Sequence, residues 1–142
     1  MSKQQGKIES TTGNTAFGES TLLVATGTDN TAIGKLALNS TTTGTDNTAI
    51  GRSTLRLNTT GLLNTAIGNY ALQNNTVGFA NTAIGYEAIL FNTLGVENIA
   101  IGYDTMLSNR IGGFNLAIGN NAMYNMYLWL PVKYFHQKRC CL

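Results

Sequence analysis

The sequence predicts an all-β protein built as a parallel β-solenoid of seven 17-residue coils. The main observation is a pentapeptide, Asn-Thr-Ala-Ile-Gly, which occupies residues 30–34, 47–51, 64–68 and 81–85, with near copies at 14–18, 98–102 and 115–119. Successive copies begin 17 residues apart, except that the first interval is one residue shorter. A fixed period of this size is typical of repeat proteins whose neighbouring copies stack on one another.

The length of the repeat and the composition favour strands over helices. A pair of helices needs a period of about 34 residues or more, twice the period found here. The chain has 16 Gly and 1 Pro, and only 11% of its residues are charged. Its apolar segments are short and rich in β-branched residues, which is typical of strands. These features predict short strands joined by frequent turns.

Each coil can be numbered from the Asn of its pentapeptide, which is position 1. Position 5 is always Gly, position 8 is Ala or Thr, position 9 is an aliphatic residue or Met after the first coil, and position 15 is Gly in most coils. We expect a strand at positions 1–4, a turn at the first Gly, a second strand at positions 8–11 and a return turn at the second Gly.

The strand alternation predicts which side chains face inward. Neighbouring residues point to opposite faces, and burial of a large aliphatic side chain stabilises the fold by roughly 1.5–3 kcal/mol, so the Ile of position 4 is expected inside. The Ala of position 3 would then face outward, and its constant small size predicts a subunit interface. The alternative is that these Ala residues face the inside of a crowded turn. The predicted interface column is Ala16, Ala32, Ala49, Ala66, Ala83, Ala100 and Ala117.

The Asn of position 1 predicts a structural ladder. Side-chain amides stacked at strand spacing can hydrogen-bond along the axis and satisfy backbone groups of the turns. The ladder residues are Asn14, Asn30, Asn47, Asn64, Asn81, Asn98 and Asn115.

The chain divides into an N-terminal cap (1–13), the repeat domain (14–123) and an aromatic, basic C-terminal segment (124–142). In this last segment Trp129 replaces the Gly of position 15, so Trp129 joins the predicted interface residues. The segment is expected to cap the last coil, to dock a partner or the next subunit, or to lie against a membrane surface. Adjacent Cys140 and Cys141 are expected to be free thiols, with an intermolecular disulfide or acylation as the alternatives.

No residue pattern indicates catalysis. The acids are scattered along the coils without His or Cys beside them, and the Gly-containing runs lack the Gly-Lys-Ser or Gly-Lys-Thr of a phosphate loop, so no catalytic, cofactor or metal residues are predicted. The formal net charge is +2, and the repeat region is nearly neutral, which makes nucleic acid an unexpected partner. No stretch is apolar and long enough for a transmembrane helix, and the first residues lack the apolar run of a secretory signal.

The units Asn64 to Leu72 and Asn81 to Ile89 carry a family likeness. They resemble the head repeats of YadA-type trimeric autotransporter adhesins, and they look closer still to the Asn-Thr-Ala-Ile-Gly arrays in tail-fibre-like proteins of phages and large viruses. The resemblance covers residues 14–123. It implies a left-handed β-roll, three chains side by side, and exposure on a virion or cell surface as a fibre or in attachment.

We therefore expect a non-enzymatic, self-assembling fibre or filament subunit. It would form a homotrimer, could extend end to end, and would be extracellular or virion-borne, with host attachment to a surface receptor or glycan as its expected role. The alternative is an ice- or glycan-binding solenoid in which columns of Thr side chains, one per coil, bind a periodic ligand. One column is the Thr of position 13. The other is the Thr of position 2, which comprises Thr15, Thr31, Thr48, Thr65 and Thr82.

Overall fold

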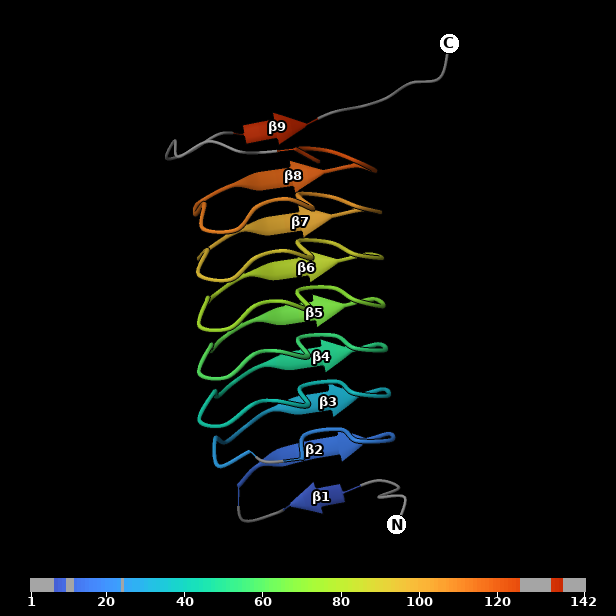
Figure 1. The fold of residues 1–142 in the computed structure, drawn as a ribbon, viewed down its shortest axis with the longest axis vertical. Coiled ribbons are helices and arrows are strands. Elements are labelled where there is room, and N and C mark those ends of the chain that lie inside the picture. Colours follow the sequence, from blue (N-terminus) through green and yellow to red (C-terminus); the bar gives the residue numbers. More distant parts are fainter. Residues whose placement is uncertain (1–6, 10–11, 24, 126–133, 137–142) are drawn as a thin grey trace.

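The computed structural model of the chain describes residues 7–9, 12–23, 25–125 and 134–136. The described residues form one nine-stranded sheet in chain order, without a helix. The strands are stacked as successive rungs, with the first and the last strand at opposite ends of the stack (Figure 1). They are β1 (Lys7–Glu9), β2 (Asn14–Phe17), β3 (Thr31–Ile33), β4 (Thr48–Ile50), β5 (Thr65–Ile67), β6 (Thr82–Ile84), β7 (Ile99–Ile101), β8 (Leu116–Ile118) and β9 (Tyr134–His136).

The strands pair in the register that the repeat predicts. Equivalent residues lie opposite each other from β2 to β8, so that Ala49 faces Ala66 and Ile50 faces Ile67, and all of these pairs are parallel. β9 continues the parallel order, whereas β1 pairs with β2 in the antiparallel sense. The prediction of an all-β parallel solenoid is confirmed.

The prediction of a second strand at positions 8–11 is wrong. In the coil of β5 this part of the chain is a series of turns, and Tyr70 and Leu72 have φ values of 63° and 50°. These left-handed values lie outside the extended region that a strand requires. The backbone still bonds between coils: Leu72 N donates to Ala88 O at 3.0 Å. Each coil thus contains one strand. Its remaining residues form turns that lead to the next strand, and we call this part of the coil the return.

The interior of the solenoid is narrow. Ala66 of position 3, Ala71 of position 8 and Leu72 of position 9 are fully buried, as are their equivalents in most coils. Ile67 of position 4, by contrast, is 37% exposed. The expectation that the Ile column is inside and the Ala column outside is therefore wrong. The physical reason is space, because the returning chain leaves room for only a methyl group behind position 3, while the larger Asn64 and Leu72 side chains fill other parts of the interior.

The two glycines of each coil meet different requirements. Gly51 of position 5 has φ of 134°, and a Cβ there would come within 2.7 Å of the Gly68 backbone in the next coil. Gly61 of position 15 has no positive φ, but a Cβ on it would meet the Gly78 carbonyl oxygen at 2.5 Å. Glycine is needed at the first site for both conformation and space, and at the second for close approach of the coils.

Candidate functional site

The Asn side chains of position 1 lie inside the solenoid and form a continuous ladder. Asn64 Nδ2 donates to Asn47 Oδ1 at 3.1 Å and to the Gly78 carbonyl at 2.9 Å. The backbone N–H of Asn64 donates to the same Asn47 Oδ1 at 3.1 Å. The pattern recurs from coil to coil between Asn14 and Asn115. These amides satisfy one another and the return turn, so their role is structural.

A second ladder, which the sequence reasoning missed, runs through position 12. Asn75 Nδ2 donates to Asn58 Oδ1 at 2.8 Å, and Asn92 Nδ2 donates to Asn75 Oδ1 at the same distance. Asn75 also donates to the Gly78 carbonyl, which therefore accepts from both ladders. The signal was present in the sequence, because Asn58, Asn75, Asn92 and Asn109 recur at the same 17-residue interval.

The Ala residues predicted as an interface do not reach the surface. Six of them are fully buried, and Ala16 is 7% exposed. Positions 1 and 3 of a coil share one face of the strand, so the inward Asn ladder requires inward Ala side chains. The alternative interpretation, in which Ala packs against a crowded return, matches this burial. Trp129, the other predicted interface residue, lies outside the described residues, as do Cys140 and Cys141.

The opposite face of the strands carries the side chains of positions 2 and 4 from β2 to β8, and we call it the outer face. Its position-4 column is apolar in every coil: Phe17, Ile33, Ile50, Ile67, Ile84, Ile101 and Ile118. All except the half-buried Ile84 are between 36% and 65% exposed. The position-2 column is Thr from β2 to β6 and then becomes Ile99 and Leu116. A flat sheet thus presents a continuous apolar stripe beside a stripe of Thr.

The Thr residues of position 13 do not form a free rank of hydroxyls. Thr59 Oγ1 donates to the Thr76 carbonyl at 3.1 Å, and Thr76 and Thr93 repeat the contact with the following coils. These hydroxyls link successive coils. Among the Thr columns proposed for ligand binding, the position-2 column on the outer face is the one that remains available.

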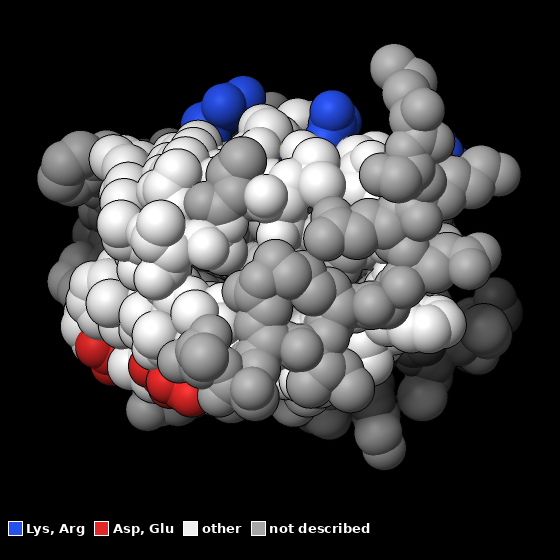
Figure 2. Space-filling view, turned by 90° about the horizontal axis from the view of Figure 1, so that it is seen from below, with Lys and Arg blue, Asp and Glu red and all other residues white. Residues whose placement is uncertain are grey.

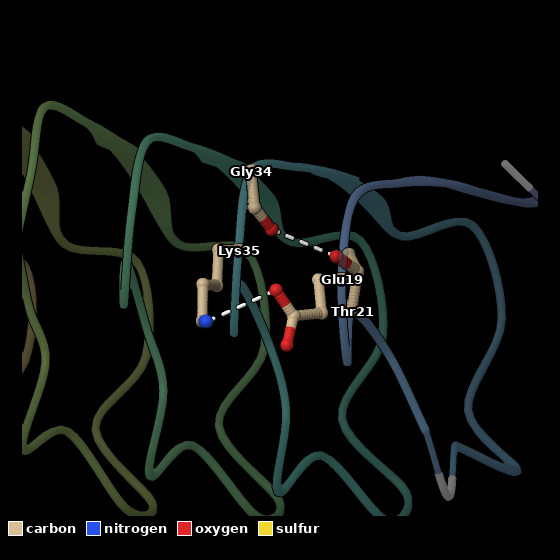
Figure 3. A network of polar contacts seen from close by, with 4 residues as sticks. All are labelled: Glu19, Thr21, Gly34 and Lys35. Atoms are coloured by element: carbon tan, nitrogen blue, oxygen red, sulfur yellow. Dashed lines mark hydrogen bonds and ion pairs between the residues drawn. The ribbon is translucent and has the colours of Figure 1, made fainter. Parts of the chain in front are cut away.

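Charged residues flank the outer face on two edges. The residue directly before each Asn, position 17, is an acid in three coils (Asp29, Asp46 and Glu97), whereas position 6 is Glu19 in the first coil and Lys35 and Arg52 in the next two. Lys35 Nζ lies 3.0 Å from Glu19 Oε2 of the preceding coil, and this half-exposed ion pair bridges two rungs (Figure 3). In the end-on view from below, the visible Asp and Glu atoms lie on one side and the visible Lys and Arg atoms on another (Figure 2).

Aromatic residues extend the position-6 edge. The rings of Tyr86 and Tyr103 are stacked with centroids 5.3 Å apart, Tyr70 meets Tyr86 edge to face, and Arg52 lies over Tyr70. A hydrogen bond to Glu87, followed by burial, raises the pKa of the Tyr86 phenol. Stacking covers one face of each ring and links successive coils, while Tyr86 and Tyr103 remain 40% and 49% exposed.

Among the described residues, Asp104 is the other titratable group whose pKa departs clearly from its ordinary value. Burial, and to a smaller degree the charge of Glu87 in the preceding coil, raises the pKa of its carboxyl. Asp104 Oδ1 is shielded from solvent and has no hydrogen-bond partner among the described residues. The described residues hold no group of three or more His, Cys, Asp or Glu able to bind a metal ion. Within the same part of the chain, no helix is long and apolar enough to cross a membrane.

Comparison with protein families, curated proteins and solved structures finds no match to this chain.

Proposed function

We propose that this protein is a structural subunit of a fibre or filament that assembles with copies of itself through the outer face, as a trimer. The observation that carries the proposal is the exposed apolar column of position 4. Exposed apolar patches of several hundred Å² or more mark interaction sites on soluble proteins. A flat column of this kind on a regular sheet fits another regular surface, and a second copy supplies one with the same spacing between rungs.

The ends of the sheet differ from each other. β1 pairs only with β2, in the antiparallel sense, and β9 pairs only with β8, in the parallel sense, so each end of the described sheet has one strand edge without a partner. Such edges can template further strands, which supports end-to-end stacking of copies as a second assembly contact. The resemblance of the repeat to surface adhesins and tail fibres supports exposure on a virion or cell surface, with host attachment as the biological role.

The test is the oligomeric state of a charged variant of the outer face. Ile67→Lys and Ile50→Lys place a charge in the apolar column, and we expect both to shift the protein from trimer to monomer in sedimentation and light scattering. Both should keep the far-ultraviolet circular dichroism of the parent. Arg56→Lys, away from the outer face, is the control. A parent protein that is monomeric at micromolar concentration would refute the proposal.

A second candidate is ice or glycan binding by the position-2 Thr column. The half-buried Thr15, Thr31, Thr48, Thr65 and Thr82 lie on a flat parallel sheet at the strand spacing of about 4.8 Å, beside the methyl groups of position 4. A rank of hydroxyls and methyls at this spacing could match a periodic ligand. Thermal hysteresis or binding on a glycan array, lost in Thr48→Lys and Thr65→Lys, would support this candidate over the structural one.

A further inference from the structure

Three tyrosines on successive coils form a column beside the outer face. Tyr86 and Tyr103 occupy position 6 of neighbouring coils, directly after the Gly that follows strands β6 and β7. Their rings are stacked, with 8° between the ring planes and 5.3 Å between the centroids. Tyr70, in the preceding coil, meets Tyr86 edge to face, with 81° between the planes. Tyr86 and Tyr103 are both exposed, so a reagent in solvent reaches this pair.

The stacked arrangement is the one that two tyrosyl radicals need in order to couple. In such a radical the unpaired electron occupies the π system, whose lobes stand perpendicular to the ring. The lobes of Tyr86 and Tyr103 therefore point toward each other, whereas those of Tyr70 and Tyr86 are crossed. Hydrogen bonds between the coils hold the stacked pair together, since Asp104 N donates to Tyr86 O at 3.0 Å. Two reacting groups that are held close and aligned react far faster than two that meet by diffusion.

Charges around the column favour oxidation of Tyr86 over Tyr70. The Tyr86 phenol donates a hydrogen bond to the Glu87 carboxylate, which can accept the proton as the electron leaves the ring. The Arg52 guanidinium lies 5.9 Å from the centroid of the Tyr70 ring, and a nearby positive charge opposes the removal of an electron. The ring that is easiest to oxidise is thus the one stacked on Tyr103.

We propose that Tyr86 and Tyr103 form a site of oxidative cross-linking, at which a haem peroxidase with hydrogen peroxide converts the stacked pair to dityrosine within one chain. Each phenol loses one electron and one proton, and a carbon–carbon bond forms between the ring carbons next to the two oxygens. Those two carbons then lose their protons and the two oxygens regain theirs, which restores both phenols. The two electrons and two protons released in total reduce one hydrogen peroxide to two waters.

Oxidation of the purified protein with a haem peroxidase and one equivalent of hydrogen peroxide tests the site. A protease that cleaves after glutamate separates the two tyrosines, because Glu87 and Glu97 lie between them, and it leaves Tyr70 and Tyr86 on one fragment. We expect fragments 20–87 and 98–142 to be joined and two hydrogens lighter than their sum, with the bond mapped to Tyr86 and Tyr103 by fragmentation mass spectrometry. The product should run as a single chain on a denaturing gel, with a yield that does not change on tenfold dilution.

Substitutions of the tyrosines separate the stacked pair from its surroundings. Tyr86→Phe and Tyr103→Phe should each lower the yield of joined fragments at least tenfold. The matched controls are Tyr70→Phe, which keeps the stacked pair, and Tyr124→Phe, which removes an exposed tyrosine outside the column, and both should leave the yield unchanged within twofold. Glu87→Gln should slow the reaction without moving the bond, because an amide cannot take the proton, and cleavage after Glu97 still separates the fragments.

The bond would tie two neighbouring coils together covalently, and the unfolding midpoint should rise by several degrees in the cross-linked protein. Joined fragments that persist in Tyr86→Phe or Tyr103→Phe would overturn the site, as would bonds that form only between copies. The step needs one chain alone, so it goes beyond the proposed self-assembly and does not depend on it. A monomeric parent that forms the bond would refute the self-assembly alone, and a trimer without the bond would refute only the cross-linking site.

Discussion

Asn47 Oδ1 accepts two hydrogen bonds from Asn64, one from its side-chain Nδ2 and one from its backbone N–H, each at 3.1 Å. The same Asn64 Nδ2 also donates to the return turn of its own coil at the Gly78 carbonyl. One amide therefore ties together two coils and closes the loop of one. The two hydrogen bonds that the Asn64 side chain donates, more than its size, stabilise the coil.

Replacing Asn64 with Asp should destabilise the protein strongly. The substitution keeps the shape but removes both Nδ2 donations and places a carboxylate beside two oxygen acceptors in a fully buried site. We expect a loss of about 3 kcal/mol or more in the free energy of unfolding, measured by denaturant titration. The control is Asn69→Asp, which is exposed and whose Oδ1 only accepts from the Arg52 backbone N–H. Similar losses in both variants would contradict the ladder's role.

Replacing Gly68 with Ala should also be costly. Gly68 has φ of 126°, and a Cβ there would meet the Gly85 carbonyl carbon at 2.7 Å. The Ala side chain would both strain the backbone and overlap the next coil. We therefore expect the free energy of unfolding to fall by about 2–4 kcal/mol, measured by thermal or denaturant unfolding. Thr60→Ala, at an exposed position of the preceding return, is the control and should change stability by less than about 0.5 kcal/mol.

Substitutions of Ala66 and Ile67 test which face of strand β5 is buried, because the two side chains point to opposite faces. Ala66→Leu adds three carbons to a fully buried column between Ala49 and Ala83, and overpacking of this kind costs about 1–3 kcal/mol. Ile67→Leu on the outer face should leave the unfolding free energy of the single chain nearly unchanged. Circular dichroism melts of both variants measure the difference. A larger effect from Ile67 than from Ala66 would reverse the assignment of the faces.

Asp104 should make stability depend on pH. Because burial raises its carboxyl pKa in the folded state, ionisation opposes folding, and this penalty is present at neutral pH. As pH falls through the folded-state pKa toward the unfolded value, the penalty disappears. Asp104→Asn is therefore expected to raise the unfolding midpoint at pH 7, and its advantage should shrink toward pH 4.

The comparison variant is Asp46→Asn, because Asp46 and Asp104 share a left-handed backbone, with φ of 57° and 52°. Asp46 is exposed, so its variant measures what the amide contributes to this backbone conformation without the effect of burial. If the advantage of Asp104→Asn does not change with pH, the burial of its carboxyl is not the cause.

Much of the fold could be read from particular residues. The recurrence of Asn and Gly at 17 residues predicts stacking, and stacking places each residue on its own copy, so the register of Ala49 with Ala66 follows. The second strand was predicted wrongly because aliphatic residues such as Leu72 are typical of strands. Its left-handed backbone is imposed by the tight return and by bonds to the next coil, which no local preference reveals.

The candidate site was predicted on the wrong face for a related reason. Ile67 is the more hydrophobic residue and Ala66 the more constant one, and hydrophobicity alone places the Ile inside. The buried partners of Asn64 overrule this preference, since a side-chain amide that donates two hydrogen bonds and accepts two in the interior fixes which face of the strand turns inward.

The sequence by itself therefore determined the repeat, the stacking of identical residues and the two alternating faces of each strand, because a period of 17 and an alternation of 2 are properties of the order of residues. Only the tertiary structure decided which face is buried. That choice depends on the width of the coil, and the returning chain fills this width so closely that Ala fits behind the strand and Ile remains outside.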